Sequence, residues 1–288
     1  MLGNFDGVHL GHRRLAERAL REGNAAGLKV GVWTFADHPK ATLCPGECAY
    51  LTSIEEKNAI FSEMGFDYVI YEDFASVRDM LPRDFAESIL ADKLDCRVAV
   101  CGFNFRFGRG GEGTPSLLGE VFRARGRKAA VEDAVTVDGE TVSSTGIRRA
   151  VEAGDMEKAA RMLGRPYRLT SPVMPGKQLG RTLGLPTVNQ FFPEDKVIPA
   201  KGIYACTCLV DGVEYRGVAN VGSRPTVGGV GLNCETHLLG YDGQAYGKVV
   251  STGFLKRLRD EKRFSGIEGL KSSIEGDIVA AKEYFSKK

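Results

Sequence analysis

The sequence predicts an α/β domain with a parallel sheet, followed by a small antiparallel β-barrel with a C-terminal helix. Over residues 1–164, short apolar strands alternate with amphipathic helices, which is typical of a doubly wound parallel sheet. Beyond residue 165 the pattern changes to strands separated by glycine-rich turns, with one terminal helix. A chain of 288 residues accommodates two domains, each with its own core. We therefore expect domains at 1–164 and 165–288.

The elements of the first domain are predicted from helix-start signals and from apolar runs. Ser53 and Glu56 form a capping box that begins one helix, and Pro82 begins another. Short apolar runs between the helices indicate buried strands. The expected elements are helices at 8–28, 53–64, 82–94 and 154–164, and strands at 29–35, 67–71 and 97–101.

Composition and charge exclude several classes of protein. The net charge of +2 does not indicate a protein that binds nucleic acid or a membrane surface through its overall charge. No apolar run approaches the ~18 residues of a membrane span, and the N-terminus lacks the pattern of a signal peptide. The seven cysteines are odd in number and scattered, which fits a reducing compartment. We expect a cytoplasmic protein that acts on small molecules; the oligomeric state stays open.

The first candidate site is the stretch GNFDGVHLGH at the start of the chain. Its glycines and Asn/Asp pair favour a tight turn before the first helix. His9 and His12 are three residues apart and therefore share one face of the first helical turn. The free N–H groups at a helix start suit a phosphate. A helix start with two solvated histidines is the alternative.

Further candidates follow two later strands. The strand at 29–35 ends just before Asp37 and His38, at the edge where open α/β sheets bind ligands; a plain turn is the alternative. The strand at 97–101 leads into a glycine-rich loop whose aromatic rings suit a flat ligand, with an ordinary surface loop as the alternative.

A capped helix supplies a third kind of candidate. Ser144 or Thr145 caps a helix whose first turns hold Arg148. Hydroxyls, helix N–H groups and a guanidinium together form a phosphate clamp. A capped helix with solvated arginines is the alternative.

The barrel carries a glycine-rich stretch of its own. Gly176, Gly180 and Gly184 allow the backbone to approach a phosphate closely. Thr187 and Asn189 alternate along an extended segment and therefore face the same side. A hydroxyl and an amide oxygen suit Mg²⁺ bound to ATP. A hairpin with two polar residues in solvent is the alternative.

Glu235 is the candidate base of the barrel. A lone Glu on a strand is usually solvated, but the leucines at 232, 238 and 239 predict partial burial here. Partial burial suits a general base. The final helix, at about 266–285, has apolar residues at helical spacing that pack it on the barrel.

These segments resemble the motifs of one family. GNFDGVHLGH resembles the nucleotide-binding signature of the nucleotidylyltransferase superfamily, in the form found in bacterial bifunctional riboflavin kinase/FAD synthetases. Further segments resemble motifs of the same family: FADHP, GFNFRFG, SSTGIR, GKQLGRTLGLPTVN, GVANVGSRPT, CETHLL and LRDEKRF. Gly146 stands where many members have Arg, so one cationic contact is expected to be absent. The resemblance covers nearly the whole chain and implies a nucleotidylyltransferase-like (Rossmann-like) domain and a riboflavin kinase barrel.

The resemblance also implies the chemistry. The protein would phosphorylate riboflavin to FMN with Mg²⁺ and ATP, and would adenylylate FMN to FAD with release of pyrophosphate. The implied catalytic residues are Glu235, His9, His12 and Arg148, and the implied Mg²⁺ ligands are Thr187 and Asn189. The implied contacts to ATP and flavins are Gly3, Phe5, Asp6, Gly7, Asp37, His38, Asn104, Phe105, Phe107, Ser144, Thr145, Gly176, Gly180, Arg181, Gly184, Pro186, Asn220 and Arg259.

One departure from the family concerns the first strand. Family members carry a strand before GNFDG, whereas only Met1 and Leu2 precede it here. Because a parallel sheet is buried on both faces, we expect the neighbours of that strand to leave backbone groups unpaired. The first domain should then be less stable than the barrel and weak in FAD synthesis. The alternatives are a monofunctional riboflavin kinase with an impaired first domain, and a non-catalytic flavin- or nucleotide-binding sensor.

Overall fold

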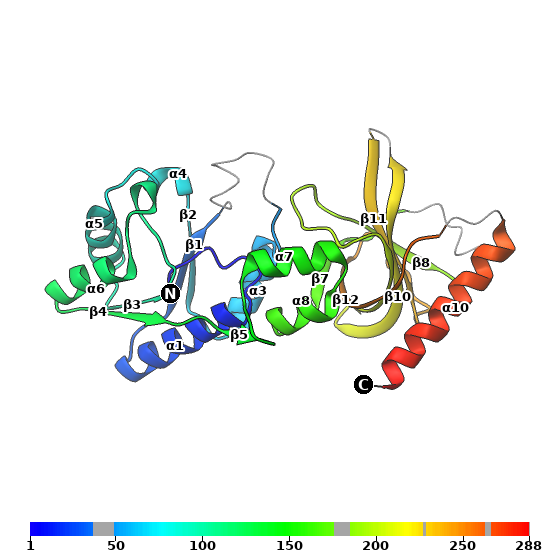
Figure 1. The fold of residues 1–288 in the computed structure, drawn as a ribbon, viewed down its shortest axis with the longest axis horizontal. Coiled ribbons are helices and arrows are strands. Elements are labelled where there is room, and N and C mark those ends of the chain that lie inside the picture. The colour runs from blue at the N-terminus through cyan, green and yellow to red at the C-terminus, as the bar shows by residue number, and fades with distance from the viewer. Residues whose placement is uncertain (37–48, 176–184, 227–228, 263–265, 288) are drawn as a thin grey trace. The chain divides into compact units, whose positions relative to one another are not determined.

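The computed structural model of the chain describes residues 1–36, 49–175, 185–226, 229–262 and 266–287 (Figure 1). The chain forms two compact units, Met1–Ser144 and Thr145–Lys288. The sequence places the domain boundary after residue 164, whereas the compact units divide after Ser144. Six candidate residues lie outside the described residues: Asp37, His38, Gly176, Gly180, Arg181 and Gly184.

The first unit is built on parallel strands with helices on both faces, as the sequence predicts. Its strands are β1 (Gly31–Phe35), β2 (Tyr68–Glu72), β3 (Val98–Gly102) and β4 (Lys128–Glu132), with a hairpin of β5 (Thr136–Val137) and β6 (Glu140–Thr141). Its helices are α1 (Leu10–Ala26), α3 (Ile54–Glu63), α4 (Phe74–Val77), α5 (Pro82–Asp84), the π-helix η1 (Phe85–Lys93), the 3₁₀ turn η2 (Arg109–Gly111) and α6 (Pro115–Ala124). Strand β1 pairs in parallel with β2, and β3 pairs in parallel with β4.

Two apolar clusters cover the two faces of this sheet. Val32 and Trp33 are adjacent on β1 and therefore point to opposite faces. Val32 packs in a cluster that includes Leu15 of α1 and Phe61 of α3. Trp33 packs in the other cluster, with Phe85 of η1 at a ring-centroid distance of 5.1 Å. Burial of both faces is what the doubly wound arrangement requires.

The first three residues of the chain pair with the backbone of both β1 and β3. Trp33 N donates to Met1 O at 2.9 Å, and Gly3 N donates to Trp33 O at 3.2 Å. On the other side, Leu2 N donates to Val100 O at 2.9 Å. The expectation that the neighbours of the first strand leave these groups unpaired is therefore wrong. The short stretch before GNFDG already runs parallel to β1, and Leu2 pairs with Trp33.

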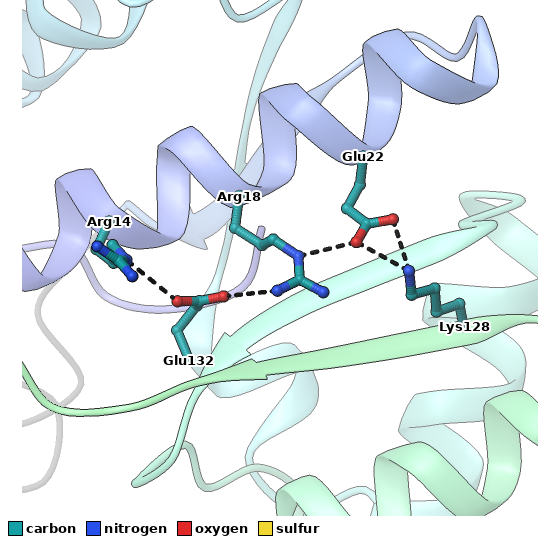
Figure 2. Close-up of polar contacts among 5 residues, drawn as sticks. All are labelled: Arg14, Arg18, Glu22, Lys128 and Glu132. Atoms are coloured by element: carbon teal, nitrogen blue, oxygen red, sulfur yellow. Dashed lines mark hydrogen bonds and ion pairs between the residues drawn. The ribbon is translucent and has the colours of Figure 1, made fainter.

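A network of ion pairs ties α1 to β4 (Figure 2). Arg18 contacts Glu22 at 2.8 Å on its own helix and Glu132 at 3.0 Å on the strand. Arg14 contacts the same Glu132 at 3.5 Å, and Lys128 contacts Glu22 at 2.7 Å. The hydrogen bonds from Lys128 and Arg18 lower the pKa of Glu22. The network thus fixes the helix that begins at the first candidate site.

The second unit contains an antiparallel sheet of six strands that curls into a half-barrel (Figure 1). The strand order is β7-β12-β9-β10-β11-β8. Its elements are α7 (Ser144–Ala153), α8 (Met156–Leu163), β7 (Tyr167–Pro172), β8 (Thr187–Phe191), β9 (Gly202–Val210), β10 (Val213–Thr226), β11 (Gly229–Leu238), β12 (Val249–Arg259) and α10 (Ile267–Ser286). Helix α8 packs on β7 and β12, and α10 packs on β9, β10 and β12.

A single buried side chain joins the two edge strands of this sheet. The side chain of Gln190 on β8 is fully buried. Its amide nitrogen donates to Leu169 O and Ser171 O of β7, at 3.2 and 3.3 Å, and to Val250 O of β12 at 3.0 Å. Its carbonyl oxygen accepts from Thr252 Oγ1 at 2.6 Å. Just after β7, Met174 N donates to Asn189 O of β8 at 2.8 Å, so the side chain of Gln190 adds to a closure in which the backbone also takes part.

Helix α10 is held to the end of β12 by an ion pair. The guanidinium of Arg259 donates to both carboxylate oxygens of Asp277, at 2.7 and 2.6 Å, and to Ser273 Oγ at 2.8 Å. Such two-point pairing fixes orientation as well as distance. Across the described ranges, each helix is too short or too polar to span a membrane.

Candidate functional site

The loop before α1 is held in a strained shape by buried contacts. Phe5 and Val8 have positive φ angles of 52° and 38°, which non-glycine residues rarely adopt. Both carboxylate oxygens of Asp6 accept from Leu51 N, at 2.9 and 3.1 Å, and one also accepts from Thr52 N at 3.1 Å. Because Asp6 is only 2% exposed, these bonds lie away from water. Asp6 therefore fixes the loop, whatever it binds in addition.

Glycines and an aromatic ring complete this loop. A Cβ on Gly3 would lie 2.9 Å from the ring of Phe5, so the close approach requires glycine. Gly7 N donates to Thr52 Oγ1 at 2.6 Å. Ser144, the last residue of the first unit, donates from its Oγ to Asp6 O at 2.9 Å. Five of the residues that the family resemblance implies as ligand contacts thus lie together: Gly3, Phe5, Asp6, Gly7 and Ser144.

The two histidines lie on one face of the first turn of α1, as their spacing predicts. His9 is the N-cap, and its Nδ1 accepts from His12 N at 3.3 Å. The two rings stack with centroids 3.5 Å apart and planes 17° apart. The ring of Phe5 packs edge-on against His12 at 5.2 Å. Two imidazoles at a helix N-terminus form a site suited to phosphate oxygens.

The aromatic loop after β3 is divided between the core and solvent. Phe107 is buried in the cluster of Trp33, with its ring 5.5 Å from that of Phe85. Phe105 stacks on Phe107 at 5.4 Å and is partly buried, whereas Asn104 is exposed. The protein core therefore accounts for the burial of Phe107. Phe105 and Asn104 are the predicted contact residues of this loop that remain accessible, and the neighbouring Phe103 is exposed as well.

In the barrel, the candidate base lies at the centre of a row of polar residues. The register places Glu235 of β11 directly opposite Asn189 of β8 and Asn220 of β10. Directly opposed residues of antiparallel strands point to the same face. Thr187 and His237 are opposed two residues further along and share that face. Thr187, Asn189 and Glu235 are thus brought together, and Asn220 joins them.

Acceptor oxygens without partners flank Glu235 on both sides. The Oδ1 atoms of Asn189 and Asn220 are buried and accept no hydrogen bond among the described residues. Glu235 itself is half-buried, and its Oε1 accepts from Asn233 Nδ2 at 3.0 Å. Buried polar atoms are normally paired, so these two orphaned oxygens indicate a missing donor or cation.

A pocket borders this row. It has a volume of about 310 Å³ and is lined by Val173, Pro186, Thr187, Val188, Asn189, Leu238 and residues 241–246. The carbonyl of Pro186 lies 2.9 Å from His237 Nδ1, which links the pocket wall to β11. The sequence analysis missed the segment 241–246, although its two tyrosines around an Asp-Gly turn are a usable signal.

Three further candidate residues, Arg259, Arg148 and Thr145, lie within the described residues. Arg259 uses its guanidinium to hold α10, as described above. Arg148 and Thr145 lie on α7, in the second compact unit. Their roles stay predictions. Across the described ranges, no group of three or more His, Cys, Asp or Glu side chains is placed to hold a metal ion.

Comparison with known proteins assigns both halves of the chain. The FAD synthetase family model matches residues 1–146, and the riboflavin kinase family model matches residues 163–285. The chain is 34% identical over 287 residues to the bifunctional riboflavin kinase/FMN adenylyltransferase of Escherichia coli strain K12, covering 99% of this chain and 91% of that protein. The chain belongs to the bifunctional riboflavin kinase/FMN adenylyltransferase family.

Other relatives agree on the family and the fold. The Bacillus subtilis strain 168 member of the riboflavin kinase/FMN adenylyltransferase family is 32% identical over 291 residues, covering 99% of this chain and 92% of that protein. A crystal structure described as a macrolide-efflux protein from Streptococcus pneumoniae has a TM-score of 0.86 and 26% identity, over 98% of this chain and 92% of that chain. The predicted family, fold class and pair of enzymatic domains are confirmed.

Proposed function

We propose that the barrel transfers the γ-phosphoryl group of ATP to the 5′-hydroxyl of riboflavin, and that the first unit adenylylates the FMN so formed. The observation that carries the proposal is the row of Asn189, Glu235 and Asn220 beside the pocket. It joins a carboxylate to two orphaned amide oxygens on one face of the sheet. Riboflavin, FMN and ATP are the substrates, and FAD is the final flavin product.

In the kinase reaction, Glu235 accepts the proton of the 5′-hydroxyl while that oxygen attacks the γ-phosphorus and ADP leaves. The hydroxyl of Thr187 and the Oδ1 of Asn189 would hold Mg²⁺, and the buried, unpartnered state of that Oδ1 fits a hard cation. Bound Mg²⁺ would neutralise charge on the phosphates. Asn220 and Pro186 are assigned to contacts with the substrates.

In the adenylylation, an oxygen of the FMN phosphate attacks the α-phosphorus of a second ATP, and pyrophosphate leaves. This reaction needs no protein nucleophile. His9, His12 and Arg148 stabilise the charge of the in-line transition state, which is an electrostatic and positioning task. Phe105 is assigned to the flavin ring because it is the partly exposed member of its stack.

The free cysteines support a cytoplasmic location. The five cysteines within the described residues are all free, and burial raises the pKa of the Cys234 thiol to about 12. Free thiols of this kind support a reducing compartment. We assign the enzyme to the cytoplasm.

The test is to incubate the pure protein with riboflavin and Mg-ATP and to separate FMN from FAD by chromatography. Both products are expected. The double change His9→Ala/His12→Ala should leave FMN formation intact while reducing the conversion of added FMN to FAD. If a folded parent protein with excess Mg²⁺ made no FMN, the kinase proposal would be wrong and a flavin sensor would replace it. If both activities fell together in a double variant of unchanged thermal stability, the division of labour would be wrong.

A further inference from the structure

Asn233 makes a contact with the candidate base that the proposed chemistry does not use. Its side chain is 4% exposed, and its Nδ2 donates to Glu235 Oε1 at 3.0 Å. The two residues are two positions apart on β11 and therefore share a face. Among the described residues, this is the hydrogen bond that the Glu235 carboxylate accepts.

The surroundings of Asn233 leave room for its amide to take this position. The residue opposite Asn233 on β10 is Gly222, which has no side chain, and the residue opposite on β8 is Phe191. A Cβ on Gly222 would lie 2.5 Å from Glu261 Oε1, so this space is shared with a second carboxylate. His237 lies two residues beyond Glu235 on β11 and therefore shares its face.

The two asparagines that flank Glu235 do not take the place of Asn233. Asn189 and Asn220 lie opposite the carboxylate on both sides, but among the described residues the side-chain amide that donates to Glu235 is that of Asn233. A Glu side chain has several rotamers, and the oxygen of a base must lie about 2.6–3.2 Å from the hydroxyl oxygen whose proton it removes. One donor is therefore needed to select one rotamer.

We infer that Asn233 is a positioning residue for riboflavin phosphorylation, which holds Oε1 of Glu235 so that Oε2 faces the substrate hydroxyl. The inference rests on the proposed function of the barrel and names a further residue of the same site. Asn233 takes no part in the proton transfer. The proton moves from the 5′-hydroxyl to Glu235, as in the proposed reaction.

Two substitutions test the inference. Asn233→Leu removes the donor and keeps a similar volume, and Asn233→Asp keeps the shape and replaces the donor with an acceptor. Because misplacing a reacting group by about 1 Å costs on the order of 10²-fold, both should lower kcat for FMN formation by roughly 10- to 100-fold. The KM values for riboflavin and Mg-ATP should stay within about threefold of the parent, since the inference gives Asn233 no contact with either substrate. Thr236→Val is the matched control, because Thr236 is buried on the same strand but on the opposite face.

A double variant separates positioning from a general structural defect. If Asn233 acts through Glu235, adding Asn233→Leu to Glu235→Gln should lower the remaining activity by less than about twofold. Multiplying losses in the double variant would overturn the inference, as would Asn233 variants with kcat within twofold of the parent. If Glu235→Gln itself kept FMN formation within tenfold, the proposed base would be wrong and this inference would fall with it.

Discussion

The substitution Asp6→Asn tests how the first candidate site is held together. The amide keeps the shape of the carboxylate but offers one acceptor oxygen in place of two, and it turns an NH₂ group towards the N–H of Leu51 or Thr52. Hydrogen bonds to charged acceptors contribute about 1.5–3 kcal/mol, and at least one is lost. We expect the first unit to lose about 2–3 kcal/mol. For a unit of this size, that loss corresponds to a decrease in Tm of roughly 5–10 °C.

The assay combines thermal unfolding with hydrogen exchange followed by mass spectrometry. In Asp6→Asn, the peptide that contains Leu51 and Thr52 should exchange faster, and FAD synthesis from added FMN should fall while FMN formation is retained. Asp73→Asn is the matched control, because Asp73 is an exposed N-cap and Asn caps helices equally well. Unchanged exchange at residues 51–52 together with an unchanged Tm would refute the assigned role of Asp6.

Two further predictions concern stability. Hydrogen bonds from Lys128 and Arg18 lower the pKa of Glu22 in the folded protein from its ordinary value of 4.5. The ionised Glu22 therefore stabilises the fold fully above pH 4.5, and this stabilisation is lost as the pH falls through the lowered pKa of the folded state. In urea unfolding at pH 7, the free energy of unfolding of Glu22→Gln should be lower than that of the parent by about 1 kcal/mol or less. The two free energies should become equal in acid, and a difference that stays constant with pH would contradict this prediction. Gln190→Leu should cost about 2–4 kcal/mol, because it removes the carbonyl that accepts from the Thr252 hydroxyl and the amide that donates to carbonyls of β7 and β12. A loss in denaturant unfolding below ~0.5 kcal/mol would contradict the assigned role of Gln190.

Local features of the fold could be predicted because they depend on a few neighbouring residues. The capping box of Ser53 and Glu56 is formed as expected, with bonds of 3.2 and 3.0 Å. The period of a strand places Thr187 and Asn189 on one face, and the period of a helix places the two histidines together. These rules need no knowledge of the rest of the chain.

Features that depend on which strands are neighbours could not be predicted in this way. The row around Glu235 exists because β11 lies between β8 and β10, and sequence periodicity does not give that order. Asn233 could not be identified from the sequence for the same reason. Its hydrogen bond to Glu235, two residues further along β11, becomes informative only when the polar neighbours of Glu235 are known.

Helix α6 and strand β4 were missed by the sequence analysis, and the expected helix at 82–94 is a short α-helical turn followed by a π-helix. The loop phenylalanines illustrate the limit most clearly. The sequence favours a ligand as the reason for their burial, whereas Phe107 is buried by Phe85 and its neighbours.

The most direct test of the central claim is a comparison of two reactions in the Glu235→Gln variant. The account predicts that FMN formation from riboflavin falls by about 10²–10⁴-fold, the loss typical of a general base, while flavin binding survives because the amide keeps the shape. The same protein should convert added FMN to FAD at the parental rate, because that reaction is assigned to the first unit. FMN formation within tenfold of the parent, or an equal fall in both reactions, would contradict the account.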